Sequence, residues 1–147
     1  MTRAYTTTSP AETEELARKL ASDLRAGTVI ALEGELGAGK TVFVKGIAKA
    51  LGITTVVQSP TFVLMKVYEV QHHAVRRLVH VDCYRLDGSS DLRAVGLEEY
   101  LHDSTSVVVI EWADKVPELV PHDATRVRIR SVDEHERTVE ITSPDRS

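Results

Sequence analysis

Three glycines within six consecutive residues constrain this chain more than any other feature. The segment from Gly34 to Thr41 reads GELGAGKT and fits the pattern GxxxxGK[ST]. The apolar, β-branched run TVIAL precedes it at 28–32, and an amphipathic run follows at 42–51. A buried strand that enters a glycine-rich turn and continues as a helix is the context in which this pattern binds phosphate. The sequence therefore predicts a phosphate-binding loop within an α/β fold.

The residue types of this loop suit a nucleotide triphosphate. Glycine lets the backbone turn so that successive amides face phosphate oxygens, and the N-terminus of the following helix adds further donors. Lys40 is expected to reach the outer phosphates, and the Thr41 hydroxyl is suited to Mg²⁺. We also expect the loop to face solvent, so that replacing Lys40 leaves the fold intact. The competing interpretation is a flexible turn with an incidental lysine, which the strand and helix context disfavours.

Two carboxylates follow apolar strand-like runs. Asp82 comes after LVHV and Glu111 after VVVI. Beside a phosphate site, one such acid supports Mg²⁺ and the other orients or deprotonates the attacking water. The residues alone leave open which acid has which role, and either can instead cap a turn.

Further polar and aromatic residues are weaker candidates. The loop QSPTF at 58–62 places Thr61 where a hydroxyl can reach Mg²⁺ or the γ-phosphate, although a plain turn explains it equally well. His80 alternates with valines, which favours a hydrogen-bonded core histidine over a base. Trp112 either borders the nucleotide or belongs to the core. Arg137 is a weak candidate for a residue that borders the adenine.

Short apolar runs alternate with helical patterns along the chain. Ser9 and Pro10 begin an amphipathic helix that we expect to end at Gly27. The further predicted elements are strands at 28–32, 62–70, 78–82 and 106–111, helices at 42–51 and 92–101 (the second broken at Gly96), and an antiparallel hairpin of 126–130 with 139–141. We expect residues 6–8 and the last five residues to be loosely held.

Length and composition limit the possible functions. A chain of 147 residues with 42% hydrophobic content suits one domain, 1–147. The formal charge of -4 gives no basic field for direct nucleic-acid binding. Cys83 is the single cysteine, so no internal disulfide can form, and we expect it to be a small buried hydrophobe. No apolar run has the length to cross a membrane, so we expect a cytoplasmic protein.

Five motifs together resemble the TsaE family. They are GELGAGKT (34–41), SPTF (59–62), HVDCYRL (80–86), GLEEYL (96–101) and IEW (110–112). The resemblance implies a P-loop NTPase-like three-layer α/β sandwich, with a mainly parallel central sheet and a C-terminal antiparallel hairpin. It also implies an ATPase that is weak alone and works with TsaB and TsaD to make threonylcarbamoyladenosine in bacterial tRNA. The tRNA would be met only indirectly, through that complex.

The same resemblance implies roles for individual residues. The phosphates of ATP would be held by Gly34, Gly37, Ala38, Gly39, Lys40 and Thr41. Thr41 with Glu111 would serve Mg²⁺, Asp82 would face the hydrolytic water or the γ-phosphate, and Thr61 would lie in a switch-like loop. The catalytic candidates are thus Lys40, Asp82 and Glu111. Glu35 and Val42 depart from the usual Asp and Thr of the family, but neither carries this chemistry.

Two other classes of function fit a phosphate-binding loop. A small-molecule P-loop kinase needs an acceptor pocket and an arginine-bearing lid, and no obvious insertion supplies a lid here. A nucleotide-gated binding module would bind ATP without meaningful turnover. Transfer of phosphate to a metabolite would favour the first, and full activity without Glu111 would favour the second.

Overall fold

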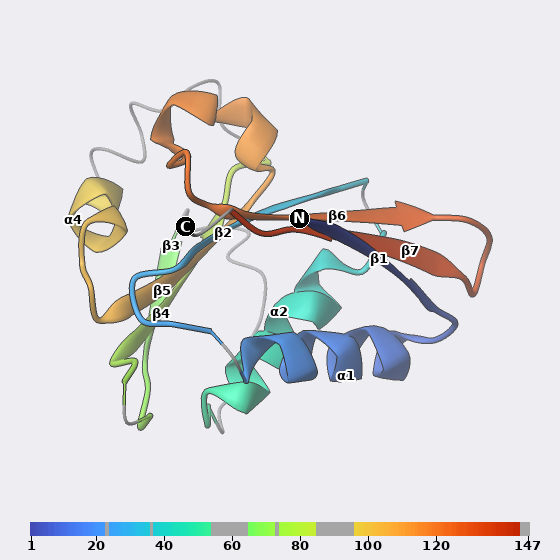
Figure 1. Cartoon of the computed structure of the whole chain (residues 1–147), viewed down its shortest axis with the longest axis horizontal. Coiled ribbons are helices and arrows are strands. Elements are labelled where there is room, and N and C mark those ends of the chain that lie inside the picture. Colours follow the sequence, from blue (N-terminus) through green and yellow to red (C-terminus); the bar gives the residue numbers. More distant parts are fainter. Residues whose placement is uncertain (23, 36, 54–64, 73, 85–95, 145–147) are drawn as a thin grey trace.

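A single mixed sheet organises the protein (Figure 1). The computed structural model describes residues 1–22, 24–35, 37–53, 65–72, 74–84 and 96–144. Within them, seven strands lie in the order β1-β7-β6-β2-β5-β4-β3. The strands are β1 (Thr2–Thr7), β2 (Val29–Gly34), β3 (Met65–Glu69), β4 (Arg77–Asp82), β5 (Ser106–Glu111), β6 (Thr125–Ser131) and β7 (Arg137–Thr142).

The middle of the sheet is parallel and its edges are antiparallel. β2 pairs in parallel with β5 and β6, and β4 pairs in parallel with β5. β3 lies antiparallel to β4 at one edge, while β7 and then β1 continue antiparallel from β6 at the other. The predicted α/β fold with a parallel centre and a C-terminal hairpin is confirmed.

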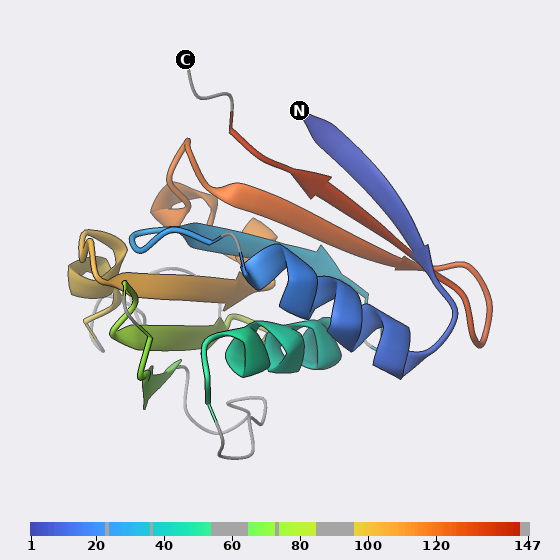
Figure 2. The same cartoon turned by 60° about the horizontal axis from the view of Figure 1, so that its bottom comes forward.

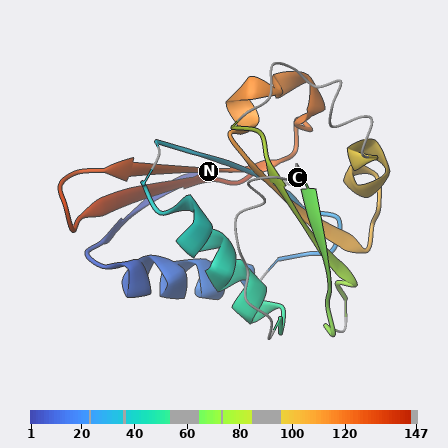
Figure 3. The same ribbon diagram turned by 180° about the vertical axis from the view of Figure 1, so that it is seen from behind.

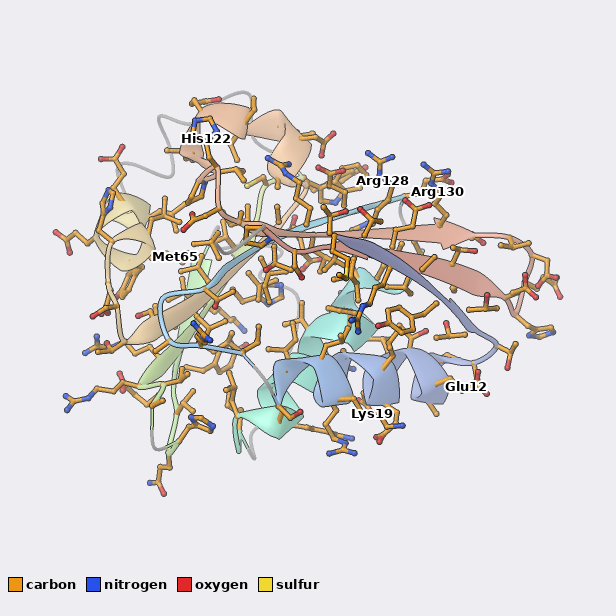
Figure 4. The ribbon with its side chains drawn as sticks, viewed as in Figure 1. Glu12, Lys19, Met65, His122, Arg128 and Arg130 are labelled. Carbon is orange, nitrogen blue, oxygen red and sulfur yellow. The ribbon has the colours of Figure 1, made fainter. Side chains whose placement is uncertain are left out.

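Helices cover both faces of the parallel part. The helices α1 (Pro10–Ala21) and α2 (Lys40–Ala50) lie side by side on one face, as Figure 2 shows. The opposite face carries α4 (Leu97–Leu101) and two 3-10 helices, η1 (Ala113–Lys115) and η2 (Pro117–Leu119), seen from behind in Figure 3. This second layer stops short of the hairpin, where Arg128 and Arg130 point away from the α1 side (Figure 4).

The two layers enclose separate cores because the central strands are buried on both faces. Leu32 and Val109 face α2 and pack with Phe43. The neighbouring residues Ala31, Val108 and Ile110 face the other way and pack with Leu97. The uniformly apolar runs at 28–32 and 106–111 correspond to this two-sided burial.

A glycine brings the two long helices into close contact. A Cβ atom at Gly46 would lie 2.2 Å from the Glu14 carbonyl oxygen and 2.7 Å from the Ala17 Cβ. Only glycine therefore allows α1 to approach α2 this closely. The start of α1 follows the predicted cap, since the Ser9 hydroxyl accepts a hydrogen bond from the Glu12 amide at 3.1 Å. This helix ends at Ala21, earlier than the predicted boundary at Gly27.

The expectation that residues 6–8 are loosely held is wrong. β1 pairs with β7 over its whole length, from Thr2 opposite Thr142 to Thr7 opposite Arg137. Thr7 is buried, and its hydroxyl lies 2.7 Å from that of Thr13. The Thr8 amide and hydroxyl both donate to Glu12. The polar threonines suggested a loop, but threonine is β-branched and suits an edge strand.

Two predicted segments lie partly outside the described residues. The beginning of the strand predicted at 62–70 falls within 54–64, and the first part of the helix predicted at 92–101 falls within 85–95. Their remaining residues form β3 and α4, and α4 begins after Gly96, where the sequence predicts a break. None of the described helices is both long and apolar enough to cross a membrane.

The turn before β5 allows a prediction about acid stability. Hydrogen bonds from the Thr105 hydroxyl and amide and from the Ser106 hydroxyl, with Arg77 nearby, lower the pKa of Asp103 to about 2. Because this lies below the unfolded value of about 3.9, the stabilisation is complete above that value and is lost as pH falls toward 2. Asp103→Asn should therefore lower the free energy of unfolding at neutral pH, by an amount that shrinks in acid. Urea unfolding of both proteins across this range tests it, and an equal difference at every pH would contradict it.

Cys83 allows a prediction about reactivity. Its side chain is fully buried, and burial raises the pKa of the thiol to about 12. Since the thiolate is the reactive form, a disulfide reagent at pH near 8 should modify the native protein far more slowly than the denatured protein. The single cysteine makes the signal unambiguous. Equal rates in both states would show that the thiol is accessible.

Candidate functional site

The glycine-rich loop joins the end of β2 to the start of α2, as predicted. Gly37 and Gly39 have φ angles of 77° and 107°, values that favour glycine. Gly39 is the N-cap of α2 and supplies no side-chain hydrogen bond, so the first-turn amides of α2 receive no capping side chain. Uncapped amides at a helix N-terminus are a site for an anion.

Lys40 is held inside the loop and does not face solvent. It is only 6% exposed, and its ammonium donates to the Gly34 carbonyl at 2.5 Å and the Glu35 carbonyl at 2.8 Å. The loop itself is exposed at Glu35 and Gly37, as expected, but it folds around its own lysine. Burial lowers the pKa of Lys40, although nearby Glu111 and Asp82 act to raise it.

The two predicted carboxylates lie at the carboxyl end of the sheet. Asp82 is opposite Glu111 in the parallel pair of β4 and β5, which places both side chains on the same face. Leu32, two residues before the loop begins, is opposite Glu111 from β2. The Asp82 carboxylate also accepts a hydrogen bond from the Tyr84 amide at 3.0 Å. The strands thus bring both acids to the edge where the loop begins.

Glu111 is buried and oriented by a histidine. Its side chain is 4% exposed, and one carboxylate oxygen is in hydrogen-bond contact with Nε2 of the fully buried His80. The prediction of a hydrogen-bonded core histidine is confirmed, but its partner was not predicted. His80 and Asp82 are two residues apart on one strand and so share a face, which is the face that Glu111 also occupies. The alternation in HVD is the sequence signal that places His80 on the side of the two acids.

Trp112 covers the lysine from outside the loop. Its ring centroid lies 4.4 Å from the Lys40 ammonium nitrogen and 5.1 Å from the Tyr84 centroid. Trp112 is also the one non-glycine with positive φ in the described part of the chain, at 59°. Such a conformation costs about 1–3 kcal/mol for an ordinary residue. Of the two alternatives for Trp112, the structure shows packing against the core, where the ring is half-buried, and it also places the ring beside the loop lysine.

Two cavities adjoin the loop. One, of about 170 Å³, is lined by the loop glycines Gly37 and Gly39 together with Val42 and Arg137. Arg137 reaches this loop, with its guanidinium 3.5 Å from the Gly37 carbonyl. The other, of about 520 Å³, lies beside Gly34 and Trp112. The loop therefore has open space on two sides.

The oxygen donors at this edge suit Mg²⁺ better than a soft metal. Mg²⁺ is commonly held by one or two carboxylates, water and substrate phosphates. Glu111 offers a carboxylate and Thr41 a hydroxyl oxygen. The described residues contain no group of three His, Cys, Asp or Glu side chains arranged for a metal, as a site built wholly from protein would need. Thr61, which the resemblance places in a switch-like loop, falls in 54–64, outside the described residues.

A known protein family matches most of this chain. The family described as threonylcarbamoyl adenosine biosynthesis protein TsaE matches residues 7–139. The chain belongs to the TsaE family. It is 39% identical to the tRNA threonylcarbamoyladenosine biosynthesis protein TsaE of Bacillus subtilis over 139 residues, which is 95% of this chain and 84% of that protein. Identity to the Streptomyces coelicolor TsaE is 44% over 116 residues, covering 78% of this chain and 76% of that protein.

A solved structure shows that the TsaE likeness extends to the fold. The crystal structure of Bacillus subtilis YdiB matches with a TM-score of 0.82 and 34% sequence identity, covering 99% of this chain and 87% of that one. The resemblance to the TsaE family is therefore confirmed. The matched residues 7–139 include the loop, both carboxylates, His80 and Trp112.

Proposed function

We propose that this TsaE-family protein binds and slowly hydrolyses ATP with Mg²⁺. The observation that carries this proposal is the buried Lys40 ammonium, bonded to two carbonyls of its own loop and flanked by Asp82 and Glu111. A buried lysine at the uncapped start of a helix is suited to a bound phosphate, and two acids beside it are suited to hydrolysis.

Each residue would have a distinct task. The amides of the loop and of the first turn of α2 bind the phosphate oxygens, and Lys40 directs its remaining donor at the outer phosphates. Thr41 and Glu111 would hold Mg²⁺, which when bound neutralises charge on the phosphates. Asp82 orients the attacking water and accepts its proton. His80 keeps the Glu111 carboxylate in one orientation.

The cavity beside Arg137 is suited to the nucleoside. It adjoins both Gly39, at the start of α2, and Val42 on the first turn of that helix. Phosphates bound at the helix start would leave the sugar and base next to this cavity, with the Arg137 guanidinium at its border. We therefore assign this side of the loop to the adenosine moiety.

We further propose that ATP turnover serves threonylcarbamoyladenosine synthesis on tRNA. Support comes from the relatives, whose names state a part in tRNA threonylcarbamoyladenosine biosynthesis, and from the formal charge of -4, which gives no general attraction to RNA. Partner proteins, TsaB and TsaD, would then contact the tRNA and carry out the transfer. ATP hydrolysis by this chain would drive a conformational cycle of the assembly that it forms with TsaB and TsaD.

Reconstitution tests this role directly. Purified chain, TsaB, TsaD and unmodified tRNA are supplied with an activated threonylcarbamoyl donor and either ATP or a non-hydrolysable ATP analogue. Modified adenosine is then counted per TsaD over many turnovers. We expect repeated turnover only with ATP and only when this chain is present. Equal yields with the analogue would show that binding suffices, and equal yields without the chain would remove it from the reaction.

A further inference from the structure

The Lys40 ammonium has a third neighbour that its predicted role does not explain. An ammonium has three N–H donors, and two of them point at the Gly34 and Glu35 carbonyls. On a further side lies the indole of Trp112, with its centroid 4.4 Å from the nitrogen. This is within the distance at which a cation is attracted to an aromatic face, and Trp gives the strongest attraction of the aromatic residues.

The backbone of Trp112 is fixed at both ends in its unusual conformation. The Trp112 amide donates to the Leu32 carbonyl on β2 at 3.1 Å, and the Trp112 carbonyl accepts from the Lys115 amide at 3.0 Å. The left-handed turn at φ 59° ends β5 directly after Glu111 and begins η1. A bulky residue keeps positive φ only where its surroundings hold it there, and such strain gathers at functional sites.

Other contacts fix the ring itself. Tyr84 packs against it at a tilt of 45°, and the Lys115 side chain, which donates to the Tyr84 carbonyl, lies 5.9 Å from the Trp112 centroid. Two cations therefore lie near the ring, the Lys40 ammonium buried in the loop and the exposed Lys115 ammonium.

We propose that Trp112 is a positioning residue, whose π face holds the Lys40 ammonium in place for the outer phosphates. The two carbonyls and the ring together restrict the ammonium. The direction of its third N–H is therefore fixed before a nucleotide binds. The ATP-dependent part of this inference rests on the proposed function, but the contact itself does not. Trp112 acts through Lys40 and has no direct chemical step.

The contact is tested without any nucleotide. Trp112 is the only tryptophan, so the intrinsic fluorescence of the protein reports on this ring alone. An ammonium near an indole alters its emission, and Lys40→Met should therefore change the intensity or the wavelength of emission. Lys115→Met is the matched control, since it removes the more distant cation from the same ring. A larger change in Lys40→Met supports the contact, and an unchanged spectrum in that variant overturns it.

The role is tested by ATP binding in variants of the ring. Trp112→Phe keeps a π face, whereas Trp112→Leu keeps apolar bulk without one. Calorimetry should show a dissociation constant about 5- to 20-fold higher for Trp112→Leu than for the wild type, with Trp112→Phe between the two. Equal affinities for the Phe and Leu variants would show that the ring only packs. If the wild type itself fails to bind ATP, the proposed function fails, and the fluorescence result decides the contact separately.

Discussion

Replacing Lys40 with methionine is expected to weaken ATP binding by about 30- to 5,000-fold, because removing one partner of a desolvated charge pair costs about 2–5 kcal/mol. The Lys40 ammonium is the cation bonded to the loop carbonyls. Methionine keeps the length of the chain and fills the buried space, which alanine would leave empty. Isothermal titration calorimetry measures the loss.

The fold should persist in this variant. Burial penalises the charged lysine, as its lowered pKa shows, so its removal relieves one cost while leaving the Gly34 and Glu35 carbonyls without that donor. We expect a change of about 1 kcal/mol in the free energy of unfolding. Lys49→Met is the matched control, since Lys49 lies in the last turn of α2 and pairs with Glu14 at the surface. Wild-type affinity in a folded Lys40→Met protein would remove the lysine from the phosphate site.

Asp82→Asn and Glu111→Gln should separate binding from hydrolysis. Each new side chain has nearly the shape of the original but no negative charge, so the affinity of each variant for ATP should stay within a few-fold of the wild type. Hydrolysis should fall by about 100- to 10,000-fold in Asp82→Asn, the usual contribution of general acid–base catalysis, and it should also fall in Glu111→Gln. Glu111→Gln should also lose the dependence of activity on Mg²⁺ concentration, because Glu111 is the proposed metal ligand.

These variants also discriminate between the two acids. Glutamine at 111 can still accept a hydrogen bond from His80, so its effect reports the lost charge and not the lost contact. Asp114→Asn is the matched control, since it removes an exposed charge beside the same loop. Phosphate release assays over a Mg²⁺ titration give the measurement. Normal hydrolysis by both variants would show that the division of labour between the acids is wrong.

Patterns that depend on local backbone chemistry predicted most of the fold. The strand at 106–111 was predicted with its observed bounds, because a β-branched run flanked by polar residues indicates a strand buried on both faces. The Ser9 cap located the start of α1, and the glycine-rich loop located the start of α2 within two residues. By contrast, β1 was missed, because an edge strand of polar residues acquires its structure only by pairing with β7, at the far end of the chain.

The site was predicted less completely, since its contacts join distant segments. The sequence indicates Lys40 and both acids by their positions after strands, but not that Lys40 is enclosed by its own loop. The partner of His80 and the ring over Lys40 both belong to the segment around Glu111. Along the sequence, this segment is about thirty residues from His80 and still farther from the loop. Such contacts follow from sheet register, which a single sequence does not specify.

The most direct test of the central claim is ATP hydrolysis by the purified chain, alone and with TsaB and TsaD, with Lys40→Met as the inactive control. We predict slow, Mg²⁺-dependent turnover that rises when both partners are present and is absent in the control. Brisk turnover that ignores both partners, or phosphate transfer to a small-molecule acceptor, would contradict the account and favour a self-contained kinase-like enzyme.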